Sequence, residues 1–174
     1  MKKHYVKELY TDALFALLKK RAYQDISIVD LVKKSGASRA SFYRNYISKD
    51  QIVDEYCEQV IGSIFDDYPI SSTNIREQVR NIFQRILDQK DKLVLLRDSD
   101  LLNRVDRYVF EGTLKQIHLN DVLNNRYQPY FFAGAASALI KAWVQYNFEE
   151  SPDEITDIFL QSLAGYMDIR QPSI

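Results

Sequence analysis

Residues 35–50 read SGASRASFYRNYISKD and combine a glycine turn, small residues, two arginines and three aromatic rings. The preceding segment, residues 27–34, places three aliphatic residues at helical spacing and ends just before Gly36. Glycine readily adopts the left-handed backbone conformation that ends a helix and redirects the chain. A second short helix is expected over residues 38–45. Two short helices joined by such a turn are typical of the helix-turn-helix, whose second helix enters the DNA major groove.

The side chains of this second helix divide into two sets. Phe42 and Tyr46 lie four residues apart, so both rings can anchor this helix to the first helix of the pair. The other sides of the helix carry Arg39, Ala40, Ser41, Tyr43, Arg44 and Asn45. We expect this second set to face DNA, although solvation alone would also explain Arg39 and Arg44.

Charge is distributed unevenly along the chain. Residues 1–50 carry 11 Lys or Arg and 5 Asp or Glu, a balance of +6, whereas residues 51–174 carry 12 and 19, a balance of −7. Nucleic-acid contact confined to one end would produce this split, because attraction to phosphates supplies most of the non-specific affinity. A chance difference between solvated faces would give the same count.

Hydrophobic periodicity predicts a nearly all-helical protein. Only five glycines and four prolines interrupt the 174 residues, so the loops must be few and short. The predicted fold class is all-α with about nine helices, near residues 4–20, 27–34, 38–45, 48–66, 74–89, 91–98, 101–118, 128–149 and 152–168. Four pairs have the spacing of an N-terminal capping box, namely Ser27 with Asp30, Ser48 with Gln51, Asn74 with Glu77, and Ser151 with Glu154.

Composition argues against several classes of protein. No apolar run approaches the roughly 20 residues of a membrane helix, so no membrane partner is expected and the predicted location is the cytoplasm. The single cysteine, Cys57, is expected to be a small buried hydrophobe, with an intersubunit disulfide as the alternative. His4 and His118 do not complete a zinc site or a catalytic triad, and there is no glycine-rich phosphate loop. No metal, cofactor or enzymatic activity is therefore predicted.

The segment ISIVDLVKKSGASRASFYRNYISKDQI resembles the N-terminal signature of the tetracycline-repressor (TetR) family of transcriptional regulators over roughly residues 10 to 55. The resemblance depends on a combination of residues in a fixed order: Gly36, Ala37, Ser38, Ala40, Ser41, the Phe42-Tyr43 pair, Tyr46 and Lys49. Tyr46 departs from the family's usual phenylalanine, and its hydroxyl must be accommodated.

The resemblance implies a DNA-binding role for each matching position. The two motif helices would meet the DNA backbone at their N-termini, at Ser27 and Ser38, while Ser41, Tyr43 and Lys49 would contact phosphates. Arg39 and Asn45 would reach base edges, because arginine can pair with guanine through two hydrogen bonds. Ala40 would allow close approach and could touch a thymine methyl group.

The C-terminal half carries two further stripes. Gly134, Ala138 and Ala142 form a strip of small residues along one expected helix, which permits close approach of another helix. A matching face on the last helix consists of Ile155, Phe159, Ser162, Leu163 and Tyr166. The resemblance implies that these helices pair with their copies in a homodimer as a four-helix bundle. The same stripes would also suit an intramolecular core.

The resemblance also implies two domains with different roles. Residues 1–50 would form the helix-turn-helix domain that binds a double-stranded DNA operator, and residues 51–174 a ligand-binding and dimerisation domain. The candidate lining of a small-molecule effector pocket is Leu87, Leu96, Tyr108, Phe110 and Trp143, which ordinary core packing would explain equally. The predicted function is a transcriptional repressor that an effector releases from DNA. The alternative is a TetR-like coactivator that binds mainly a protein partner.

Overall fold

The structure is a computed structural model that describes residues 2–67, 74–119 and 126–168, with side chains described over 4–65, 74–117 and 126–164. Its helices are α1 (Lys2–Leu18), α2 (Ile28–Ser35), α3 (Arg39–Asn45), α4 (Asp50–Tyr56), α5 (Ser63–Asp67), α6 (Ile75–Leu87), α7 (Lys90–Asp98), α8 (Leu102–Leu119), α9 (Gln128–Gln145) and α10 (Pro152–Asp168). A π-helical segment, Cys57–Gly62, joins α4 to α5 without a break, and Tyr23–Asp25 form a 3₁₀ turn. With α4 and α5 counted as one, the described residues form nine helices and no strand, so the predicted all-α fold is confirmed.

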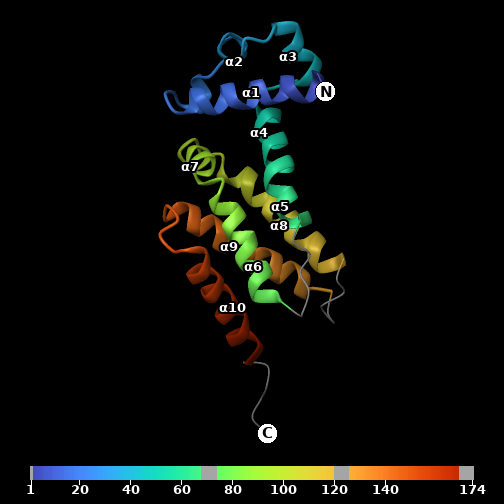
Figure 1. The fold of residues 1–174 in the computed structure, drawn as a ribbon, viewed down its shortest axis with the longest axis vertical. Helices are drawn as coiled ribbons and strands as arrows, with labels where there is room; N and C mark the ends of the chain where they lie inside the picture. The colour runs from blue at the N-terminus through green and yellow to red at the C-terminus, as the bar shows by residue number, and fades with distance from the viewer. Residues whose placement is uncertain (1, 68–73, 120–125, 169–174) are drawn as a thin grey trace.

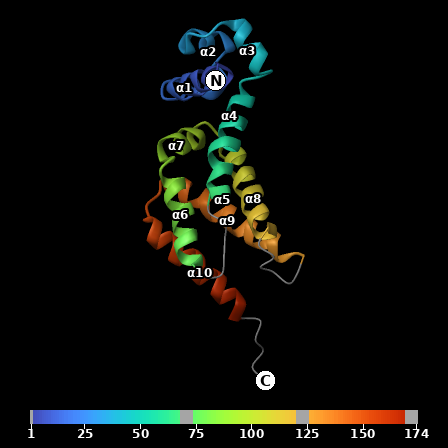
Figure 2. The same ribbon diagram turned by 45° about the vertical axis from the view of Figure 1, so that its right-hand side comes forward.

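The molecule is elongated, with α1, α2 and α3 forming a head at one end (Figure 1). Helix α4 leaves the head and runs into a body built from α5 to α10, an arrangement that Figure 2 shows from a second direction. In the body α8 pairs with α9, α10 packs on α6, and the π-helical segment packs on α8. Because α4 contacts α1 as well as the body segment that follows it, the domain boundary at residue 50 stays a prediction.

The head is held together by an aromatic cluster around Tyr10 of α1. The Phe42 and Tyr46 rings are buried and stand edge-on to the Tyr10 ring, at centroid distances of 5.3 and 6.0 Å. The Tyr10 hydroxyl donates a hydrogen bond of 2.9 Å to the carbonyl oxygen of Ser38, the residue that caps α3. The prediction that these two rings anchor the helix is therefore confirmed, but the ring that they meet belongs to α1 and not to α2, the first helix of the motif.

Local capping signals succeeded at two of the four predicted helix starts. The Ser27–Asp30 and Ser151–Glu154 pairs each form reciprocal hydrogen bonds between side chain and backbone. Gly36 ends α2 with a φ of +70°, as the predicted turn requires.

The caps predicted at Ser48 and Asn74 are wrong. Helix α4 begins two residues later than expected, with Lys49 at the N-cap position, and the Gln51 side chain accepts from the Ile47 amide at 2.7 Å. Asn74 precedes α6 but forms no capping hydrogen bond through its side chain.

The centre of the body is tightly packed around Cys57 and Gly112. Cys57 is fully buried, and burial raises the pKa of its thiol to about 12. Its interpretation as a small buried hydrophobe is confirmed, and the intersubunit disulfide is wrong because the thiol cannot reach a second chain. On α8, Gly112 faces Phe65 so closely that a Cβ atom there would lie 2.7 Å from the ring. Among the described residues, no helix combines the length and the hydropathy needed to cross a lipid bilayer.

The Tyr46 hydroxyl is buried without a hydrogen bond that would replace its hydration. The side chain is 3% exposed, and among the described residues its oxygen has no hydrogen-bond partner. Burial and the nearby Glu55 carboxylate raise the pKa of this phenol. Glu55 itself accepts from the Lys7 ammonium group at 2.5 Å. The hydroxyl therefore loses its hydration on folding and forms no hydrogen bond of good geometry, although Glu55 lies close to it.

We expect Tyr46→Phe and Tyr10→Phe to change stability in opposite directions, although each removes one buried hydroxyl. Tyr46→Phe should raise the free energy of unfolding by about 1 kcal/mol, because it removes an unsatisfied polar group. Tyr10→Phe should lower it by about 1 kcal/mol, because it removes a buried hydrogen bond to the Ser38 carbonyl oxygen, which then keeps only its bond from the Phe42 amide. Urea denaturation of the two variants measures both changes, and a loss of stability in both would show that the Tyr46 hydroxyl has a partner in solution.

Candidate nucleic-acid interface

Helix α3 presents the predicted contact residues on the side away from the aromatic cluster. Ser38, Arg39, Ala40, Tyr43 and Arg44 are exposed, whereas Ser41 and Asn45 are half-buried. No acidic residue lies in the first turn of α3, and the Ser41 amide donates to the Ser38 hydroxyl oxygen at 3.1 Å. The structure therefore brings these seven residues together at one exposed, basic surface.

Two side chains on this surface are partly pre-ordered. The Arg39 guanidinium group lies over the Tyr43 ring, 5.8 Å from its centroid, which restricts the rotamers of both residues. The Asn45 amide nitrogen donates to the Ser41 carbonyl oxygen at 2.7 Å, which leaves its amide oxygen to accept a hydrogen bond. Arg39 thus keeps its hydrogen-bonding edge available, while Asn45 has one group already occupied.

The N-terminus of α2 is less open to a phosphate. The Asp30 carboxylate accepts from the Ser27 hydroxyl at 2.6 Å and from the Ser27 amide at 2.9 Å, and it pairs with Arg21 at 3.1 Å. The hydrogen bond from the Ser27 hydroxyl, followed by the other bonds, lowers the pKa of Asp30 to about 2. The carboxyl group is therefore ionised at neutral pH. A phosphate contact at Ser27 stays a prediction, and it requires the hydroxyl to turn away from a negative charge.

Lys49 is bound inside the head. Its ammonium group donates to the carbonyl oxygens of Tyr23 at 2.6 Å, Ile26 at 2.8 Å and Gln24 at 3.4 Å, and it lies 4.3 Å from the centroid of the Tyr23 ring. All three donors of an ammonium group are thereby directed at backbone oxygens. These contacts fasten the start of α4 to the turn that precedes α2. A phosphate contact by Lys49 stays a prediction, but it would have to replace them.

A series of polar contacts continues from this turn into the body. The Tyr23 hydroxyl donates to Asp50 at 2.5 Å, and Arg104 of α8 pairs with Asp50 at 3.2 Å and with Asp54 at 2.7 Å. Sequence reasoning missed Arg104, because its partners lie about fifty residues earlier and one arginine gives no pairing signal.

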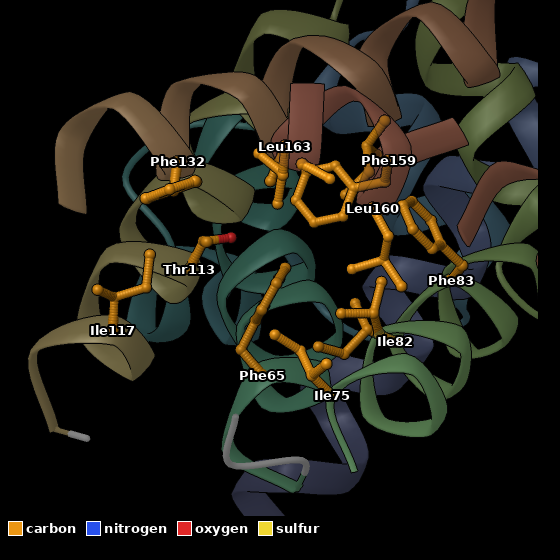
Figure 3. Close-up of a pocket in the computed structure, with 14 residues that line it drawn as sticks. Phe65, Ile75, Ile82, Phe83, Thr113, Ile117, Phe132, Phe159, Leu160 and Leu163 are labelled. Atoms are coloured by element: carbon orange, nitrogen blue, oxygen red, sulfur yellow. The ribbon is translucent and has the colours of Figure 1, made fainter. Parts of the chain in front are cut away.

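The body contains an apolar cavity of about 270 Å³ between α5, α6, α8, α9 and α10 (Figure 3). The residues that line this apolar cavity are Phe65, Ile75, Val79, Ile82, Phe83, Thr113, Ile117, Phe132, Ala136, Ile140, Phe159, Leu160, Leu163 and Ala164.

None of the five residues predicted to line an effector pocket borders this cavity. Leu96 and Trp143 are buried in the core, where the indole N–H of Trp143 donates to the Glu150 carbonyl oxygen at 3.0 Å. Leu87 and Tyr108 are partly buried against the same core, and Phe110 borders a separate hollow between α8 and α9. The sequence contained a signal for the lining of the apolar cavity. Phe132, Ala136 and Ile140 follow one another at intervals of four residues and therefore share one face of a helix.

The residues predicted for a dimer interface are divided among three environments. On α9, Ala138 is exposed, and Gly134 and Ala142 are half-buried. On α10, Ser162 is exposed, Ile155 is buried in the core, and Phe159 and Leu163 border the apolar cavity. The Tyr166 side chain lies outside the described residues. Tyr146 and Ile158, which the stripes of these two helices include, are exposed, and so is Phe131, which the sequence reasoning missed.

Metal-ligating side chains do not gather in the part of the chain that the structure describes. No three His, Cys, Asp or Glu side chains there lie close enough together to hold a metal ion.

Comparison with known proteins relates the head to one family. The sequence pattern of the family "Bacterial regulatory proteins, tetR family" matches residues 11–56, which contain α2, α3 and α4. The uncharacterized HTH-type transcriptional regulator YxbF of Bacillus subtilis (strain 168) is 21% identical over 164 residues, which cover 91% of this chain and 43% of the relative. The chain spans about half the length of the curated relatives that it matches.

Solved structures extend the likeness to the body. Lin0861 from Listeria innocua superposes with a TM-score of 0.73 at 20% identity, over 95% of this chain and 92% of that one. A TetR transcriptional regulator from Streptococcus agalactiae 2603V gives a TM-score of 0.65 at 17% identity, over 92% and 94%. At these identities the superpositions show the fold, whereas the match over residues 11–56 concerns the motif itself. Together with the geometry of α2 and α3, they show that residues 11–56 form the helix-turn-helix domain of the TetR family of transcriptional regulators.

Proposed function

We propose that this protein is a sequence-specific repressor that binds operator DNA as a homodimer in the cytoplasm and is released by a small-molecule effector. The observation that carries the proposal is the exposed surface of α3, which joins Arg39 and Tyr43 to a helix fixed on its other side by buried rings. Such a helix can enter the major groove as a rigid unit, without first becoming ordered.

Contacts to DNA are of two kinds: those that position the protein on the duplex and those that read the base sequence. In our proposal Ser38, Ser41 and Tyr43 donate to phosphates and fix the register of α3. Arg39 reads a guanine through two hydrogen bonds, and Ala40 allows the backbone to come close to a base edge. Ser27, Arg44 and Asn45 complete the proposed contact set, while Lys49 acts from inside the head by holding the start of α4 against the turn before α2.

A second copy of the chain binds, in this proposal, on the face of α9 that contains Gly134, Ala138 and Ala142. These residues follow the cavity-lining residues of α9 by two positions, which is about 200° around a helix, so they face away from the cavity. Phe131 and Tyr146 extend this face, and Ile158 and Ser162 supply its continuation on α10. A dimer of this kind would read two half-sites about one helical turn, ~34 Å, or a multiple apart.

Helix α8 is suited to couple an effector to DNA binding. Thr113 and Ile117 in its second half line the apolar cavity, while Arg104 in its first half pairs with Asp50 and Asp54 of α4. A ligand that favours one position of α8 would therefore bias α4 and the head. By linkage, a ligand that favours the state in which the two heads do not fit the operator must weaken DNA binding by its differential affinity for the two states.

Binding to DNA from upstream of the protein's own coding region tests the proposal most directly. We expect tight binding that random competitor DNA does not displace, at moderate salt, because base contacts add to the attraction between charges. Binding no stronger than that of the competitor, repeated with a genomic fragment library, would favour the coactivator alternative.

We expect Arg39→Ala to weaken binding to the selected fragment by about 1–3 kcal/mol and to leave binding to random DNA nearly unchanged, because only the base contact is lost. Fluorescence anisotropy with both DNAs measures the two changes. Arg85→Ala is the matched control, since it removes the same charge from an exposed position in the body. An equal loss on both DNAs would mean that Arg39 contacts only phosphate.

We expect Lys49→Met to lower the free energy of unfolding by about 2 kcal/mol, since three backbone carbonyl groups lose a charged donor. The slope of log Kd against log salt should stay the same as for the unchanged protein. Lys34→Met, at an exposed position of α2, serves as the control and should change stability by less than about 0.5 kcal/mol. If Lys49→Met instead reduces the salt slope by about 0.9 at unchanged stability, Lys49 binds a phosphate.

A further inference from the structure

We propose that the apolar cavity binds an uncharged, hydrocarbon-rich molecule of roughly nine or ten non-hydrogen atoms, which deepens the proposed function by naming the chemical class of its effector. The effector role rests on the proposed function, but binding itself does not.

The chemistry of the lining excludes a charged ligand group. Among the residues that the structure describes, no charged side chain lines the cavity, and Thr113 is the one lining residue with a polar side chain. The Thr113 hydroxyl donates to the Val109 carbonyl oxygen at 2.8 Å, so its proton is not available to a ligand. An ionised carboxylate or ammonium group placed here would lose its hydration without gaining a partner.

The nearest ion pairs between α6 and α10 do not alter this conclusion. Arg80 pairs with Asp153 at 3.0 Å, and Arg76 pairs with Asp157 at 3.0 Å. These side chains are about half exposed and already paired with one another. They fasten α10 to α6 beside the cavity and are not among its lining residues.

The volume sets the size of the ligand. At about 30 Å³ for each water-sized group, which is also roughly the volume of a methylene, 270 Å³ holds about nine such groups. Aromatic rings supply much of the wall, and Figure 3 shows Phe65, Phe83, Phe132 and Phe159 around the central space. The wall therefore suits an alkyl chain or a single substituted ring.

The cavity is better matched by an apolar ligand than by a second copy of the chain. Its apolar lining reaches the surface at Ile75, which is 41% exposed, so an apolar molecule bound here would be stabilised by removing this lining from water. A second copy would meet the opposite face of α9, which carries Ala138 and Ala142, and not the face that carries Phe132, Ala136 and Ile140.

Isothermal titration of the full chain with matched probes tests the proposal. Nonan-1-ol and octanoate each have about ten non-hydrogen atoms, but octanoate is ionised at pH 7.5, and n-butylbenzene provides an uncharged ring of similar size. We expect at least one uncharged probe to bind once per chain, at least tenfold more tightly than octanoate.

Variants connect that binding to the cavity. Ala136→Leu occupies part of the space, and Ala164→Trp adds bulk at an exposed position of the lining, so that one variant remains if the other does not fold. Each should weaken binding of the uncharged probe at least tenfold. Ala22→Leu is the matched control, because it makes the same kind of change at an exposed position of the head, and it should bind the probe as well as the unchanged protein does.

The possible results separate the two proposals. Octanoate binding as tightly as the uncharged probes, no binding of either uncharged probe, or binding unaffected in both Ala136→Leu and Ala164→Trp would overturn the cavity inference. Operator binding would be unaffected by that outcome. Probe binding that leaves the DNA complex intact would support the cavity inference while removing the proposed release mechanism.

Discussion

The edge-on packing of Phe42 and Tyr46 against Tyr10 is the interaction on which the head depends. Helix α3 has seven residues, too few to be stable alone in water, so its existence and its direction both come from these contacts. The hydrogen bond from the Tyr10 hydroxyl to the Ser38 carbonyl oxygen fixes the start of the same helix. The residues that face outward are therefore positioned by residues that are fully enclosed.

A second organising element is α8, which contributes to two unlike environments. Its first half pairs through Arg104 with carboxylates of α4, and its second half helps to enclose the apolar cavity. Between these two halves, Gly112 lies against the Phe65 ring. Any residue with a Cβ atom at this position would force the ring or the helix to move. A small displacement of α8 would shift the closely packed residues on both sides of it, because well-packed interiors transmit strain.

Features encoded by neighbouring residues could be predicted from the sequence, and features that depend on distant ones could not. The Ser27–Asp30 cap, the Gly36 turn and the pairing of Phe42 with Tyr46 each involve residues within four positions of one another. The internal contacts of Lys49 escaped prediction because their acceptors are backbone oxygens, which leave no mark in the sequence. The apolar cavity escaped because it is the space left between five helices, whose packing no local pattern specifies.

The internal pairing of basic residues also affects how the protein approaches DNA. Lys7, Arg21 and Lys49 are engaged within the molecule, whereas Lys19, Lys20, Lys33, Lys34, Arg39 and Arg44 have no acidic partner among the described residues. At physiological salt their field fades within about 8 Å, so attraction begins only on close approach. The body carries a balance of −7 and is repelled by the same phosphates. Because that repulsion is screened over the same distance, the charges select among encounters at close range: a molecule that meets the duplex with its head is retained, and one that meets it with its body is not.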